Sequence, residues 1–144
     1  MSTRVKSPLV VIVLFLWIGF VCAISFMEAW LKFQAPGVTL PIGLGIGRLV
    51  FGALNKVEWV FALAILLTSF VKQRGSVKRQ NLYFLIPLII LILQSIWLLP
   101  ALDVRAVQLI EGQVVPPSNL HFYYVGCEVV KVIALVSIGI KQFK

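Results

Sequence analysis

Four long runs of apolar residues, separated by short polar stretches or by Pro and Gly, dominate the pattern of this chain. They cover approximately residues 8–33, 42–72, 79–99 and 119–141. Each run has the roughly 20 residues that a helix needs to cross the hydrocarbon core of a bilayer. Because the connections are short, neighbouring helices should run antiparallel. The pattern predicts one all-α domain over residues 1–144, an integral membrane protein built as an up-down four-helix transmembrane bundle.

Proline and glycine mark most boundaries between the runs. Gln34-Ala35-Pro36-Gly37 separates the first two, and Gly112 to Pro117 separates the last two. Pro87 lies inside the third run, where it predicts a kink rather than an end. Pro100 leaves two alternatives open. Residues 101–111 either continue the third helix or form a separate amphipathic helix at the membrane surface.

The first run has a competing interpretation as a secretory signal peptide. Val21-Cys22-Ala23 resembles a small-residue cleavage site. The apolar character continues past Ala23 to Leu31, which favours a retained transmembrane helix.

Several glycines lie near the start of the second run, at positions 43, 45, 47 and 52. We do not interpret them as a dinucleotide-binding fingerprint, because no strand precedes them. The four-residue spacing of Gly43 and Gly47 is more typical of close helix packing in membranes.

The charge distribution predicts the orientation of the bundle. Hydrophobic residues make up 60% of the chain and charged residues 12%, against about 25% charged residues in soluble domains. The formal net charge is +8. All of this excess lies at one end, because the basic residues there have no acidic neighbours: Arg4, Lys6, Lys72, Arg74, Lys78, Arg79, Lys141 and Lys144. Positive charge collects on the cytoplasmic side, so we expect cytoplasmic N- and C-termini, in a bacterial inner (cytoplasmic) membrane.

The basic character does not indicate nucleic-acid binding. No run of Lys and Arg is interleaved with surface aromatic residues. The partners that we expect are membrane lipids and, since so short a chain would need further copies to enclose a pathway, a homo-oligomer.

The non-cytoplasmic half is electrically balanced and contains charges at membrane depth. At 1.5 Å per residue, Glu58 lies about 21 Å from Lys72, while Glu128 and Lys131 lie about 20 Å and about 15 Å from Lys141. These three residues are therefore inside a hydrocarbon core about 30 Å thick, where each charge costs about 2.5–3.5 kcal/mol. Both a buried salt bridge that fixes helix packing and a functional site would explain them.

Helical periodicity places polar residues on shared faces. His121, Tyr124, Glu128 and Lys131 form one stripe, and Arg48, Asn55 and Glu58 form another on a helix that runs the same way. Glu28 and Lys32 have the i, i+4 spacing of a helical ion pair. All four helices bring polar groups to the non-cytoplasmic half. The candidate site comprises Glu28, Lys32, Arg48, Asn55, Glu58, Gln94, Asp103, Arg105, His121, Tyr124, Glu128 and Lys131.

Three classes of function fit such a site. We favour the binding or translocation of a small solute, ion or proton. The alternative is a membrane-embedded enzyme acting on a lipid or isoprenoid, with Glu58, Glu128 and His121 as candidate acids and bases. The second alternative is a structural or accessory membrane subunit, in which the charges are buried pairs.

The sequence predicts no metal site, and it leaves the identity of any cofactor unknown. The chain has one His, and a single His with carboxylates and Tyr is a poor ligand set for zinc or copper. Cys22 and Cys127 lie in apolar runs without a Cys-x-x-Cys spacing. We expect both to be small buried side chains.

Overall fold

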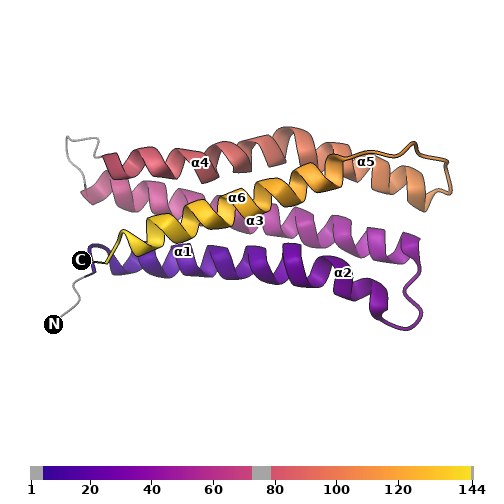
Figure 1. Cartoon of the computed structure of the whole chain (residues 1–144), viewed down its shortest axis with the longest axis horizontal. Helices are drawn as coiled ribbons and strands as arrows, with labels where there is room; N and C mark the ends of the chain where they lie inside the picture. The colour runs from indigo at the N-terminus through magenta and orange to yellow at the C-terminus, as the bar shows by residue number, and fades with distance from the viewer. Residues whose placement is uncertain (1–4, 73–78, 144) are drawn as a thin grey trace.

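A computed structural model describes residues 5–72 and 79–143, which form one elongated bundle of helices (Figure 1). Most of the predicted basic turn, residues 73–78, lies outside the described residues, as do Arg4 and Lys144. Within the described ranges the chain is helical and has no strand. Its extended pairing is limited to an isolated bridge between Val5 and Phe143.

The first apolar run forms a continuous helix whose winding changes along its length. It consists of α1 (Pro8–Val21), a π-helical segment η1 (Cys22–Glu28), α2 (Ala29–Leu31) and a 3-10 turn η2 (Lys32–Gln34). Pro8 lies in the first turn, where its missing N–H breaks no helical hydrogen bond. Gly37 has a φ of 83° in the turn that follows, a conformation that glycine adopts without strain.

The second apolar run forms α3 (Leu40–Lys72), and the third forms α4 (Arg79–Leu93), the π-helical η3 (Gln94–Leu98) and α5 (Leu99–Ile110) in direct succession. Neither Pro87 nor Pro100 ends the third helix. Of the two alternatives for residues 101–111, the structure has the continuation. The wider π turn just before Pro100 accommodates a ring that would otherwise clash with the carbonyl four residues earlier. The fourth run forms α6 (Leu120–Ile140).

These four helices are long and apolar enough to cross a membrane. The candidate spans are Pro8–Gln34, Leu40–Ser69, Tyr83–Ile110 and Leu120–Ile140, in agreement with the sequence prediction. Many large apolar side chains point outward, among them Leu49, which is 77% exposed, and Ile96, which is 72% exposed. So much exposed apolar surface is unusual for a soluble monomer and suits contact with lipid.

The helices alternate in direction along the bundle (Figure 1). The helix α1 packs against α3 and α6, α4 packs against α6, and α5 packs against α3. Val5 and Phe143, the first and last described residues, lie at one end of the bundle, the terminal end. There the Lys6 side chain donates a hydrogen bond to the carbonyl of Lys141. The turns over residues 35–39 and 111–119 lie at the other end, the distal end. An apolar core that includes Leu14, Leu54, Leu91 and Leu135 fills the interior.

Candidate functional site

A group of polar side chains is enclosed within this apolar core. It comprises Trp17 from α1, Glu58 from α3, Gln94 from η3, and Glu128 and Lys131 from α6, and we call it the buried cluster. The relative exposure of each of the five residues is 0%. Every one of the four long helices therefore contributes to a charged site that solvent does not reach.

Lys131 is the centre of the buried cluster. Its ammonium forms ion pairs with Glu58 and with Glu128, the latter at 3.3 Å between Nζ and Oε1. It also donates a hydrogen bond of 2.6 Å to the amide oxygen of Gln94. The amide nitrogen of Gln94 donates to Glu128 Oε1 at 2.8 Å. The Trp17 indole donates to Glu58 Oε1, also at 2.8 Å.

The hydrogen bonds of the buried cluster leave some oxygens without a partner. Among the described residues, the buried side-chain atoms that lack one are Ser25 Oγ, Glu58 Oε2 and Glu128 Oε2. The donors Trp17, Gln94 and Lys131 thus reach the Oε1 atoms of the two glutamates. A buried acceptor without a donor costs about 1–3 kcal/mol, so the oxygens without a partner need a chemical explanation.

A second polar junction lies beside the buried cluster, between α3 and η3. Ser95 Oγ accepts hydrogen bonds of 2.9 Å from the Asn55 amide and from the Trp59 indole. It donates in turn to the carbonyl of Leu91, at 2.7 Å. Gln94 and Ser95 are neighbours in the π segment. Their side chains therefore bind different partner helices, Gln94 on α6 and Ser95 on α3.

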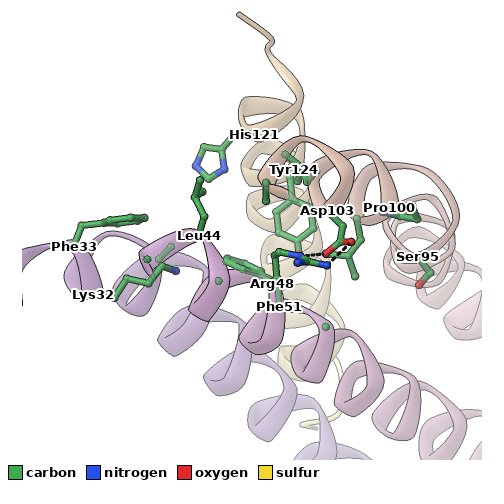
Figure 2. A pocket seen from close by; sticks show the side chains of 17 residues that line it. Lys32, Phe33, Leu44, Arg48, Phe51, Ser95, Pro100, Asp103, His121 and Tyr124 are labelled. Atoms are coloured by element: carbon green, nitrogen blue, oxygen red, sulfur yellow. Dashed lines mark hydrogen bonds and ion pairs between the residues drawn. The ribbon is translucent and has the colours of Figure 1, made fainter. Parts of the chain in front are cut away.

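The distal half contains a pocket of about 380 Å³. Its walls come from α2, η2, α3, η3, α5 and α6, and most of its lining is apolar, with Leu44, Phe51 and Leu102 among the contributors. Figure 2 shows Arg48 reaching toward Asp103, with the rings of Phe51 and Tyr124 close to this pair. Those two rings meet edge to face, with centroids 5.4 Å apart.

Two ion pairs contribute charge to the pocket. Arg48 on α3 binds Asp103 on α5 through two hydrogen bonds, Nε to Oδ1 at 2.5 Å and Nη2 to Oδ2 at 3.0 Å. Two parallel bonds of this kind fix the geometry of both partners. Lys32 binds Glu28 at 3.1 Å, and its ammonium lies 5.6 Å from the centre of the Phe51 ring.

Gly43 and Gly47 have no side chain, and this leaves space for the side chains of η2 that line the pocket. A Cβ atom at Gly43 would overlap the ring of Phe33, and one at Gly47 would lie 3.2 Å from the Lys32 ammonium. The sequence predicted that these glycines mark close packing between helices. What approaches each glycine is the side chain of Phe33 or Lys32.

The sequence-based candidates separate into two layers. Five of them line the pocket: Lys32, Arg48, Asp103, His121 and Tyr124. Four belong to the buried cluster: Glu58, Gln94, Glu128 and Lys131. The remaining three lie beside these layers. Glu28 pairs with Lys32, Asn55 bonds to Ser95, and Arg105 donates to the carbonyl of Pro116.

Two polar residues in or beside these layers are outside the list of sequence-based candidates, although Ser95 has the same predicted depth as Gln94 and Glu58. Trp17 completes the buried cluster, and Ser95 connects Asn55 to Trp59. One signal for Trp17 was present. It lies about 16 Å from Lys6 along α1, far deeper than the interfacial belt where membrane tryptophans usually collect, and a buried indole N–H usually has an acceptor.

His121 and the cysteines are the remaining reactive side chains. His121 is exposed at the pocket, and its ring lies edge-on to that of Phe122 with 6.3 Å between centroids. Cys22 and Cys127 are free thiols of intermediate burial, so the prediction that both are buried is wrong. In residues 5–72 and 79–143, no group of three or more His, Cys, Asp or Glu is placed to hold a metal ion.

Comparison with known proteins adds no family to this geometry. No protein-family model matches the chain, and neither curated proteins nor solved structures show significant similarity to it. The function is therefore argued from the pocket and the buried cluster.

Proposed function

We propose that this protein binds a small amphipathic molecule in the distal pocket. The observation that carries the proposal is the pocket itself, since its volume of about 380 Å³ lies within the range of small-molecule sites, about 300–1,000 Å³. Its lining has the usual character of such sites, which are mostly apolar with a few placed polar groups.

The polar groups of the pocket suit a ligand that has one polar part. Arg48 and Asp103 are held in place by each other and are still 37% and 44% exposed. His121 is exposed beside them. These groups would bind the polar part of a ligand, while Leu44, Phe51 and other apolar neighbours would contact its hydrocarbon part.

Binding is better supported than catalysis by the glutamates. Acid–base catalysis requires a side chain within hydrogen-bond reach of the substrate. Glu58 and Glu128 are completely buried and do not line the pocket. A purely structural role for the protein would explain the buried cluster. It would not explain the distal pocket or the polar side chains that line it.

The proposal includes an orientation. The excess positive charge of the sequence lies at the terminal end, and such charge is retained on the cytoplasmic side. We therefore place both termini in the cytoplasm and open the pocket toward the opposite side, in a protein of the inner (cytoplasmic) membrane.

A pair of glycine variants tests the binding proposal. Gly52 lines the pocket, and a Cβ atom there meets nothing within 4 Å. Gly52→Leu should therefore fill the pocket without straining the helix. Native mass spectrometry of protein released from native-lipid nanodiscs should detect a bound small molecule in the wild type. We expect at least about tenfold lower occupancy in Gly52→Leu, equivalent to about 1.4 kcal/mol.

Gly45→Leu is the matched control. Gly45 lies on the same helix, also has open space around its Cβ position, and does not line the pocket. This variant should retain the molecule as the wild type does. Equal retention by both variants, or no bound molecule in the wild type, would contradict the proposal.

A further inference from the structure

The donors of the buried cluster all point to one oxygen of each glutamate. Glu58 Oε1 accepts from Trp17 and contacts Lys131. Glu128 Oε1 accepts from Gln94 and from Lys131. The Oε2 atom of each glutamate is buried and has no hydrogen-bond partner. Both carboxyl groups therefore have one oxygen free, in a place that water does not reach.

Lys131 is surrounded by hydrogen-bond acceptors. An ammonium group can donate three hydrogen bonds and can accept none. Lys131 Nζ contacts three oxygens, from Glu58, Gln94 and Glu128. Each of the three ammonium hydrogens thus has an acceptor. An uncharged amine has only two hydrogens and would leave one of these oxygens without a donor.

The buried cluster then has one negative charge too many. Two carboxylates and one ammonium leave a net charge of minus one, and an uncompensated buried charge costs several kcal/mol. The nearby titratable groups on α6 are Tyr124, whose phenol lies within hydrogen-bond reach of the Glu128 carboxyl group, and Cys127. Neither supplies a positive charge. On α3, Lys56 is exposed. Arg48 binds Asp103, ten residues and about 15 Å along the helix from Glu58. The cluster members on α1 and η3 are Trp17 and Gln94, and both are uncharged.

We propose that the buried cluster binds one proton, carried on a free Oε2 atom of Glu58 or Glu128. The proton comes from water, forms an O–H bond to that oxygen, and makes the cluster electrically neutral. Because both carboxyl groups contact the same ammonium, the proton belongs to the pair rather than to one residue. A buried group that lacks a counter-ion is neutralised by the same kind of proton uptake. This inference does not depend on what the distal pocket binds.

Infrared spectroscopy of the protein in lipid nanodiscs at neutral pH tests the inference. The C=O stretch of a protonated carboxyl is separate from the bands of ionised carboxylates. The wild type should show this band with the intensity of one carboxyl group per chain. Glu58→Gln and Glu128→Gln should each abolish it, because the remaining carboxylate alone neutralises Lys131 and needs no proton. Glu111→Gln, at an exposed residue outside the cluster, should leave it unchanged.

The loss of one band in two different variants is the signature of a shared proton. A wild type without the band would overturn the inference, as would a band that persists in either glutamine variant. Each variant keeps a paired Lys131 and should fold. A measurement that needs no variant supports the same test. Raising the pH of the wild type should weaken the band as the proton is lost, by at most the intensity of one carboxyl group per chain. A loss equal to two carboxyl groups would contradict a single shared proton.

Discussion

At the scale of single residues, Lys131 connects the interior side chains of several helices. Its ammonium contacts side chains from α3, η3 and α6, and it is fully buried. Replacing a buried ion pair as a whole by apolar residues is often harmless, whereas removing one partner leaves a charge without compensation. The ion pairs themselves therefore add little to the stability of the fold. Lys131 matters because the two buried carboxyl groups would lack a counter-ion without it.

The variant Lys131→Met measures this dependence. It leaves Glu58 and Glu128 in the core without a cation, and we expect a loss of about 3–5 kcal/mol in the free energy of unfolding. Denaturant titration in mixed micelles measures it. Lys56→Met is the control, because Lys56 is exposed on α3 and forms no ion pair in the described part of the chain. Equal stability of the two variants would show that the buried cluster is not strained by the loss of its cation.

The residues of the buried cluster were partly predictable from the sequence. Glu58, Glu128 and Lys131 stand out because charge at membrane depth must find a partner, and helical spacing gave their common direction. Trp17 was not predictable in the same way, because an apolar face accepts an indole without any polar pattern. The division into a pocket and a closed cluster was not predictable either, since periodicity gives the face of a residue but not whether solvent reaches it.

At the scale of elements, the two π-helical segments differ most from expectation. The sequence predicted four regular helices, and most of their bounds agree with the structure to within about two residues, as is usual for helix ends. The exception is the third helix, which was predicted over residues 79–99 with its extension left open and which continues to Ile110. Periodicity does not reveal a local change to five-residue hydrogen bonding. In η3 this change coincides with Gln94 and Ser95, which bind α6 and α3 respectively. The π segment therefore connects the third helix to both neighbours.

The variant Ser95→Ala tests the connection between η3 and α3. It removes the acceptor of both Asn55 and Trp59, and two half-buried donors lose their partner. We expect a loss of about 1–3 kcal/mol in unfolding free energy. Ser137→Ala is the matched control, since Ser137 is exposed and bonds only to its own helix, at the carbonyl of Ile133. A Ser95→Ala protein as stable as this control would show that the junction contributes nothing measurable.

At the scale of the whole molecule, the two ends of the bundle differ in structure. The sequence places an excess of basic residues at the terminal end. At this end Lys6 donates hydrogen bonds from its backbone and its side chain to the carbonyls of Gln142 and Lys141. The distal end has the pocket, whose walls include residues of η2, α3 and α5. The buried cluster lies between them and separates the pocket from the terminal end.

The central claim is a pocket in the distal half that opens on the non-cytoplasmic side, and accessibility to a membrane-impermeant thiol reagent in intact cells tests it most directly. Cysteines would be introduced singly at Leu44 in the pocket, at Gln113 in the distal turn, and at Ser76 in the predicted basic turn. The background would have Cys22 and Cys127 replaced by Ala. We expect labelling at positions 44 and 113 and none at position 76. Labelling at position 76, with positions 44 and 113 protected, would contradict both the orientation and the proposed access to the pocket.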